Sequence, residues 1–459
     1  MNALSRRLNR AARGDDGLTL VEVLVAMMIF AVVSLGVAYS LVMTVQISSD
    51  ARGRQTASNV AASTIDRMRS IANFSDVGPS TSTVSVNGRN YFVTVTTNIV
   101  GANGGASSQC SSGSGAPVYK SVNVDVSWQG MSSKATPVQA DTAVAPSARL
   151  NDPNLGVIVT SVKTATGAGN QGVTVKAVPD PVTPNGARSI VSTISPTDAQ
   201  GCSVVFGVSP GNYIVSISET LSGNPSIDSN QSLTPSFPVT VSAGGSATAP
   251  FQFDQASLFQ PTFTSVGAIV PPGMPTSFSN TYATWTRSAS PFYLHPYTTG
   301  YFVIAGSLAA NGGTASNCLS VDPGNWPLSA DGMIVGTRQP AVATAPGGVA
   351  PASVPVGIVQ IDTSVLNAGY IKAVAQTTGP GGTDDPGCAS PSTYVIPIPT
   401  PSTSTTIALP FGSWAFYAGN SASQTNTVGN GVTVITRGSV AQASGASIAT
   451  LDPRNPVVP

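Results

Sequence analysis

The sequence predicts a mainly β protein that begins with one long α-helix, and three observations support this fold class. The run from Val23 to Val45 carries no charged residue. As a helix it would extend roughly 34 Å, enough to cross a bilayer core. After residue 80, short stretches of alternating apolar and polar residues recur between Gly, Pro and Asn turns. Only 9% of the 459 residues are charged, and Ser, Thr and Val are abundant where Lys and Glu are scarce.

The charge balance excludes several classes of protein. The chain has 20 basic and 20 acidic residues, so it lacks the positive charge of a nucleic-acid binder, and we expect no direct nucleic acid binding. A single histidine, His295, and four cysteines without CxxC spacing argue against a zinc site. We therefore expect no metal and no other cofactor.

The first residues set the membrane topology. Arg6, Arg7, Arg10 and Arg13 precede the apolar run, so this side is expected to stay in the cytoplasm and the bulk of the chain to lie outside. Glu22 lies at the start of the run, where an unpaired carboxylate costs a few kcal/mol. Cleavage before Leu18 would place a new amino group near the depth of this carboxylate, and a neighbouring subunit could then neutralise it.

The segment from Gly17 to Tyr39, GLTLVEVLVAMMIFAVVSLGVAY, resembles the cleavage and methylation segment of type IV prepilins and type II secretion pseudopilins. The resemblance implies that residues 1–17 are a leader, that prepilin peptidase cleaves after Gly17 and that Leu18 becomes the methylated N-terminus. It also implies that Glu22 guides assembly with other pilin subunits. Leu18 departs from the family, which usually has phenylalanine there. The alternatives are an ordinary signal peptide, for which the apolar run is too long, or a plain signal anchor.

The helix is expected to continue past the membrane. Small and apolar residues recur at three- or four-residue steps as far as Ala72, and Gly78-Pro79 should end the helix. We therefore predict a transmembrane and assembly helix over 18–77, half of it in lipid before assembly and half packed on a sheet, as in the resembled family. Residues 78–136 alternate as strands around an Asn87-Gly88 turn and predict a pilin-like antiparallel head. Residues 137–154 are expected to be a linker.

Residues 155–255 predict a β-sandwich of short strands. Within it, TDAQGCSVVFGVSPGNYIVSISET, residues 197–220, resembles the Cna B-type repeats of bacterial surface adhesins. Some of these repeats form an isopeptide bond, and the resemblance implies Lys163 as its amine, Asp254 as its carboxyl and Glu219 as its proton relay. Such chemistry needs a neutral lysine beside a protonated acid. The alternative is that Lys163 and Glu219 are solvated strand residues.

Residues 256–459 predict one or two further sandwich modules. Eight aromatic residues gather between residues 278 and 302, where they either fill a core or form an adhesive surface. His295 lies among them without an acid or nucleophile pattern, so we expect a structural role.

The four cysteines face an oxidising exterior, where disulfides are the default. Three pairings are open to four cysteines. Cys318 with Cys388 is favoured because both lie in the last part of the chain, which leaves Cys110 with Cys202.

These observations predict a minor pilin-like structural subunit of a type IV pilus-like filament. A bulky extension would obstruct packing along a shaft, so we expect a position at the tip and an adhesive role toward a surface or host receptor. A pseudopilin of a type II secretion or competence-type apparatus is the alternative. The chain lacks GxSxG, HExxH and P-loop motifs, so an enzyme is not expected. The protein should be a single-pass inner-membrane protein before assembly and part of a surface filament afterwards.

Overall fold

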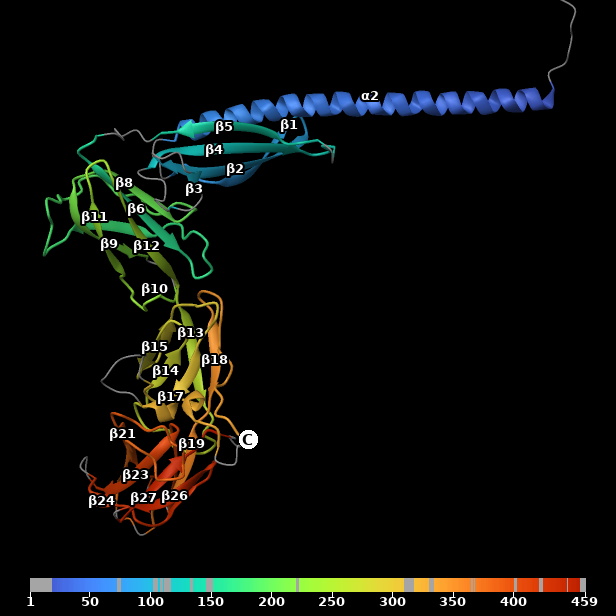
Figure 1. The fold of residues 1–459 in the computed structure, drawn as a ribbon. Helices are drawn as coiled ribbons and strands as arrows, with labels where there is room; N and C mark the ends of the chain where they lie inside the picture. The colour runs from blue at the N-terminus through green and yellow to red at the C-terminus, as the bar shows by residue number, and fades with distance from the viewer. Residues whose placement is uncertain are drawn as a thin grey trace, which may run out of the picture. The chain divides into compact units, whose positions relative to one another are not determined.

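The computed structural model confirms the predicted fold class: one long helix precedes many antiparallel strands (Figure 1). It describes residues 19–71, 76–101, 106–107, 110, 117–132, 135–145, 152–219, 223–308, 318–329, 334–364, 366, 368–399, 403–420, 424–443 and 445–454. The chain divides into two compact units. Unit 1 comprises residues 1–108 and 118–147, and unit 2 comprises residues 109–117 and 148–459.

Helix α2 (Leu20–Arg69) begins unit 1 and runs for 50 residues. Within the described part of the chain it is the one helix long and apolar enough to cross a membrane. The large apolar side chains of its first half, from Leu20 to Ile47, are exposed in the isolated chain. In its second half, Ala57, Val60 and Ala61 are buried. The helix therefore has one half that needs an outside partner and one half that packs on its own sheet.

The predicted end of the helix at residue 77 is wrong, because α2 stops at Arg69 with Ser70 as its C-cap. Val77 is instead fully buried in the head, and its carbonyl accepts a hydrogen bond of 2.8 Å from Lys120 Nζ. In the sequence, the three- to four-residue periodicity of small and apolar residues continues to Ala72. It therefore gave no sign that the helix ends earlier and that Val77 is buried in the head.

The head of unit 1 is an antiparallel sheet in the order β1-β2-β4-β5, with a short β3 paired to β2. Its strands are β1 (Ser80–Val86), β2 (Arg89–Gly101), β3 (Ala106–Ser107), β4 (Pro117–Trp128) and β5 (Val138–Val144). Figure 1 shows α2 lying along this sheet. The linker expected over 137–154 is partly wrong, since β5 pairs with β4 from Val138 to Val144. The polar residue Thr142 occupies a buried position of β5, where the sequence pattern of a strand would have an apolar residue. The sequence of the segment therefore resembles that of a polar linker.

Trp128 fixes how α2 lies on the head. Its side chain is buried against Gly53 of the helix. A Cβ at position 53 would lie 2.6 Å from Trp128 Nε1, closer than atoms normally approach. The glycine therefore permits the indole ring to pack directly on the helix backbone.

The first module of unit 2 is a β-sandwich with sheets β10-β12-β6-β8 and β11-β9-β7. Its strands are β6 (Gly156–Lys163), β7 (Thr174–Pro179), β8 (Cys202–Val208), β9 (Gly211–Ser218), β10 (Ser226–Asp228), β11 (Ser236–Val241) and β12 (Ser246–Gln255). The first and last strands, β6 and β12, pair in parallel. Ile158, Tyr213 and Phe253 lie in the core between the two sheets.

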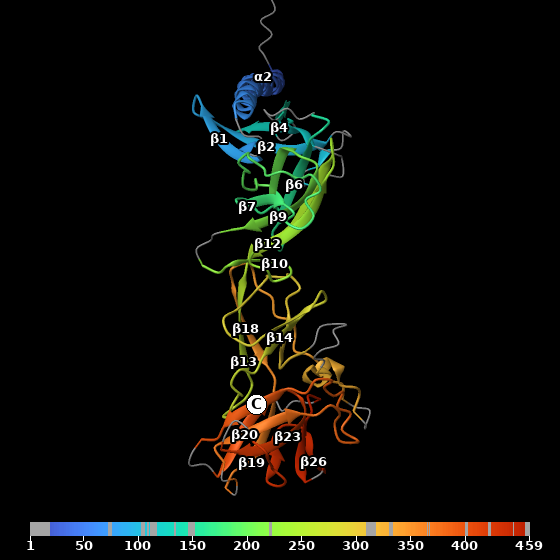
Figure 2. The ribbon, with the colours of Figure 1, turned by 90° about the vertical axis from the view of Figure 1, so that its left-hand side faces the viewer.

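The second module has sheets β16-β13-β18 and β15-β14-β17. Its strands are β13 (Ser257–Phe263), β14 (Thr276–Ser279), β15 (Thr284–Arg287), β16 (Phe292–Leu294), β17 (Phe302–Ala305) and β18 (Val349–Val354). Figure 2 shows β13 and β18 side by side, and they pair in parallel. Most aromatic residues of the 278–302 segment lie in or against this core, whereas Tyr282 is exposed.

The last module has sheets β22-β19-β25 and β21-β20-β23-β27-β26, with β24 paired to β23. Its strands are β19 (Gly357–Asp362), β20 (Tyr370–Ala375), β21 (Thr393–Pro397), β22 (Ser404–Leu409), β23 (Gly412–Gly419), β24 (Asn426–Thr427), β25 (Val432–Val434), β26 (Gly438–Ala443) and β27 (Ala446–Leu451). Two short 3-10 helices, η2 (Leu319–Val321) and η3 (Pro323–Asn325), precede it. One continuous apolar core joins the second and last modules, with Tyr301 and Trp414 among its members.

Candidate functional site

Glu22 lies in the first turn of α2, at the apolar end of the chain. Thr19 caps the helix, and its hydroxyl accepts a hydrogen bond of 3.3 Å from the Glu22 backbone N–H. The Glu22 carboxylate is exposed and makes no ion pair with any other described residue. The positive end of the helix dipole stabilises a carboxylate here, but a surrounding lipid environment destabilises an unpaired carboxylate. The site is therefore suited to receive a cation from another molecule. The predicted processing residues Gly17 and Leu18 lie outside the described residues.

A groove of about 780 Å³ opens where the second half of α2 begins, between the helix and the β1–β2 hairpin. Arg89 of β2 bridges its two walls: its guanidinium donates to the Ser49 carbonyl at 3.3 Å and to the Ser49 hydroxyl at 2.9 Å. Gly53 and Tyr91 also line the groove. These contacts tie the head to the helix close to the point where the apolar segment ends.

The three residues implied for an isopeptide bond lie on or beside neighbouring strands. Lys163 ends β6 and is opposite Gln252 of β12, while Asp254 lies two residues further along β12. The buried Asp254 carboxylate accepts a hydrogen bond of 2.9 Å from the backbone N–H of Ala165, in the loop directly after Lys163. The first and last strands are thus adjacent, as the proposed cross-link requires.

Glu219 follows β9 and is half buried. Its Oε2 accepts a hydrogen bond of 2.8 Å from the hydroxyl of Ser226 on β10. Strand β10 pairs with β12, with Ile227 opposite Asp254. This places Glu219 at the β10 side of the same sheet, and the isopeptide bond remains a prediction.

The cysteines are paired as Cys110–Cys202 and Cys318–Cys388. Cys110 lies in the 109–117 segment of unit 2 and joins β8 at its first residue. Cys318 and Cys388 also form an isolated antiparallel β-bridge just before η2. Each bond closes a long loop, with sequence separations of 92 and 70 residues.

His295 has the structural environment that the sequence suggested. It is 0% exposed, and its Nδ1 lies 3.0 Å from the carbonyl of Ile227 in the preceding module. Burial lowers the pKa of His295, although this hydrogen bond and the charges of Asp254 and Asp228 oppose the shift. Neutral imidazole with Nδ1–H as donor satisfies the Ile227 contact. Its Nε2 has no hydrogen-bond partner among the described residues.

Gln231 links this histidine segment to the first module of unit 2. Its Oε1 accepts a hydrogen bond of 2.8 Å from the His295 backbone N–H, and its Nε2 donates to the Tyr301 hydroxyl at 3.0 Å. The Tyr301 hydroxyl in turn donates to the His295 carbonyl at 2.7 Å. The arrangement is a joint between two modules and contains no nucleophile paired with a base.

A cluster of charged residues in the last module was missed from the sequence. Arg437, Asp452 and Arg454 come together with Asp384, which lies about 70 positions earlier in the chain. No motif connects them, and in the sequence they lie in three separate segments. Their meeting is visible only in the folded chain.

Comparison with known proteins identifies one family segment: residues 13–38 match the family described as prokaryotic N-terminal methylation motif. None of the curated proteins matches the chain. Among solved structures, the Bacillus anthracis TIE protein is similar, with 10% identity over 82% of this chain and 71% of the other, and a TM-score of 0.19.

Two further solved structures are similar to this chain. The Streptococcal ancillary pilin has 10% identity over 50% of this chain and 72% of the other, with a TM-score of 0.18. The pilus adhesin SpaC from Lactobacillus rhamnosus GG, in an open conformation, has 11% identity over 74% of this chain and 47% of the other, with a TM-score of 0.15. No function is inferred from these likenesses.

Proposed function

We propose that this chain is a minor pilin-like structural subunit of a type IV pilus-like filament. The observation that carries the proposal is the continuity of three features: the methylation motif at 13–38, the exposed apolar half of α2, and the packing of its other half on an antiparallel sheet. An apolar helix of this length can leave lipid only if other apolar helices replace the lipid. Filament assembly provides that replacement.

Processing and topology follow from the motif. Prepilin peptidase cleaves after Gly17 and methylates Leu18, while the basic leader stays in the cytoplasm. Before assembly the apolar half of α2 spans the membrane with the head outside. In the filament, Glu22 pairs with the N-terminal amino group of a neighbouring subunit, which removes the cost of a carboxylate in an apolar environment.

The β modules of residues 148–459 support a position at the filament tip and an adhesive role. They follow the head in the chain and add bulk that a helically packed shaft would have to accommodate at every repeat. At a tip this constraint is absent. The role is structural, and the same motif also suits a pseudopilin of a type II secretion or competence-type apparatus.

Peptide and intact-mass spectrometry of filaments sheared from cells, with membranes analysed in parallel, tests the proposal. We expect a peptide that begins at N-methylated Leu18, present in the sheared fraction. A mature chain that begins at Met1, or after Ala38, would contradict the pilin assignment. A methylated Leu18 found only in membranes would favour the pseudopilin alternative.

A further inference from the structure

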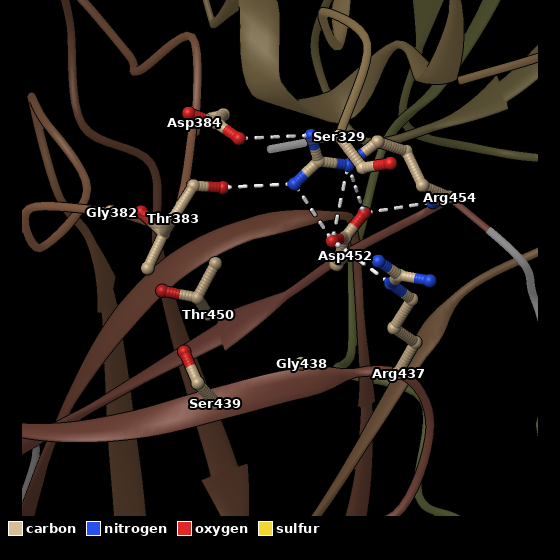
Figure 3. Close-up of a pocket in the computed structure, with 10 residues that line it drawn as sticks. All are labelled: Ser329, Gly382, Thr383, Asp384, Arg437, Gly438, Ser439, Thr450, Asp452 and Arg454. Atoms are coloured by element: carbon tan, nitrogen blue, oxygen red, sulfur yellow. Dashed lines mark hydrogen bonds and ion pairs between the residues drawn. The ribbon is translucent and has the colours of Figure 1, made fainter. Parts of the chain in front are cut away.

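The last module contains a polar cavity of about 340 Å³ (Figure 3). It is formed where the loop after β20, the start of β26 and the residues after β27 meet. The side chains used below are Asp384, Arg437, Ser439, Asp452 and Arg454. A cavity of this volume lies within the range of small-molecule sites and is large enough for a single sugar unit.

The back of the cavity is built by a buried Arg454. Its guanidinium donates to Asp452 Oδ1 through Nε at 3.0 Å and to Asp452 Oδ2 through Nη2 at 2.9 Å. Nη1 donates to Asp384 Oδ2 at 3.2 Å and to the Pro327 carbonyl at 3.2 Å. Nη2 also donates to the Thr383 carbonyl at 3.1 Å. All three nitrogens of Arg454 are engaged, so this residue holds the two carboxylates in place and has little left to offer a ligand.

The front of the cavity offers groups that are not engaged. Arg437 reaches Asp452 Oδ2 through Nε alone, at 3.3 Å, and its Nη1 and Nη2 have no partner among the described residues (Figure 3). Asp384 Oδ1 likewise has no described partner, and the exposed Ser439 hydroxyl makes no hydrogen bond to a described residue. The cavity therefore presents a fork of donors, a carboxylate acceptor and a hydroxyl that can act as either.

The backbone around the cavity is held in conformations that side chains disfavour. Asp384 has φ 55°, in the left-handed region. Gly438 has φ 156°, and a Cβ there would lie 1.9 Å from the Thr450 carbonyl oxygen. The left-handed conformation costs free energy at a non-glycine residue such as Asp384, and such residues gather at ligand-binding sites. At position 438 only glycine fits, because it has no Cβ.

The charges identify the class of ligand. Two arginines and two aspartates face each other, so the cluster is neutral overall. A strongly charged ligand would be attracted by one pair of these side chains and repelled by the other pair, which carries a charge of the same sign as the ligand. A neutral polyol meets no such repulsion. Its hydroxyls can accept hydrogen bonds from Arg437, donate to the Asp384 carboxylate, and either donate to or accept from Ser439. We propose that this cavity binds a neutral hexose unit of a glycan, a proposal that rests on the adhesive role given above.

The test uses the full processed chain in micelles of a detergent without a sugar headgroup. Saturation-transfer NMR is recorded with the methyl glycosides of glucose, mannose and galactose, and with methyl glucuronate as the charged comparator. We expect transfer to at least one neutral glycoside. Ser439→Tyr fills the cavity without removing a described hydrogen bond and should abolish transfer. Val440→Tyr, next to it on β26 but not lining the cavity, should leave it unchanged.

Arg437→Lys provides a second variant that keeps the charge and removes the fork of donors. We expect it to weaken binding about tenfold, the loss of a hydrogen bond from a charged group. Absence of transfer to all three neutral glycosides, binding of glucuronate alone, or full binding by Ser439→Tyr would each overturn the proposal. Because binding is measured on the purified chain, a negative result leaves the finding of methylated Leu18 in filaments untouched, and a failed filament test leaves sugar binding measurable.

Discussion

Large apolar side chains are exposed in the first half of the helix of unit 1 and buried in the last two modules of unit 2. In α2, Leu20 is 76% exposed and Phe30 is 73% exposed, and this exposure continues to Ile47. In the last modules, Tyr301, Trp326 and Trp414 are buried within one continuous core. The helix is complete only when lipid or other subunits cover it, whereas the modules satisfy their own apolar surface. Under the proposed function, assembly thus depends on the first region, and recognition is assigned to the polar surface of the second.

The largest expected effect is on filament assembly and comes from Glu22, the charged residue at the start of the exposed apolar half of α2. Glu22→Ala should lower the amount of protein in sheared filaments about tenfold or more, because no carboxylate remains to pair with a neighbouring amino group. Val23→Ala removes apolar volume next to it and should assemble normally. Quantitative immunoblots of sheared and membrane fractions measure the effect. Equal incorporation of Glu22→Ala and the original chain would contradict the assembly role.

The disulfides test whether the modules of unit 2 are self-sufficient. Replacing Cys318 and Cys388 by serine should lower the free energy of unfolding by about 2–4 kcal/mol, because the unfolded chain regains the entropy of an open loop. The Cys110 and Cys202 double replacement is the matched comparison. Its loop is of similar length, so the two double replacements should lower the free energy of unfolding by amounts that agree to within about 0.5 kcal/mol. Guanidinium denaturation measures both, and no change in either variant under oxidising conditions would argue against the pairs.

Gly53 tests how firmly the helix is joined to its own head. Gly53→Ala places a Cβ against the Trp128 indole and should cost about 1–3 kcal/mol of stability through overpacking. Gly36→Ala is the control on the same helix, since nothing lies within 4 Å of a Cβ there. Trp fluorescence during thermal unfolding reports the difference. If both variants melt at the same temperature, Trp128 does not pack on α2 as described.

His295 makes stability in unit 2 dependent on pH. Burial lowers its pKa below the ordinary 6.5, so below pH 6.5 the unfolded chain binds a proton that the folded chain resists. The free energy of unfolding should therefore fall with decreasing pH, by at most about 1.4 kcal/mol per pH unit from this group. His295→Asn, whose amide can still donate to Ile227, should flatten this dependence. Denaturation curves at pH 7.5 and 5.0 measure it, and an unchanged slope in the variant would rule His295 out.

The smallest change expected is one of mass alone. An isopeptide bond between Lys163 and Asp254 joins amine to carboxyl and releases one water, so the intact mass would be lower by one water molecule. Lys163→Arg keeps the charge and prevents the bond, so the mass should then equal the calculated value. Glu219→Gln should also leave the water in place if Glu219 relays the proton. An original chain at the full calculated mass would show that the residues are only hydrogen-bonded.

Much of this architecture could be predicted from local patterns in the sequence. An uncharged run, a methylation motif that overlaps it and alternating strands between turn residues each depend on residues close together in the chain, so the long apolar helix and the mainly β class could be predicted. Two boundaries could not. The end of α2 depends on Val77 being buried under the sheet, and β5 depends on its pairing with β4. Both are long-range contacts that periodicity does not report.

The sequence by itself therefore determined the long apolar helix, the place of Glu22 at its start and the strand-rich character of the remainder, because these follow from patterns among residues close together in the chain. Only the tertiary structure decided that Asp384, Arg437 and Arg454 line one cavity, and that the His295 imidazole lies 3.0 Å from the carbonyl of Ile227 in another module. The physical reason is the same in both cases. A charge or an imidazole acquires its role from the groups that enclose it, and those groups come from distant strands.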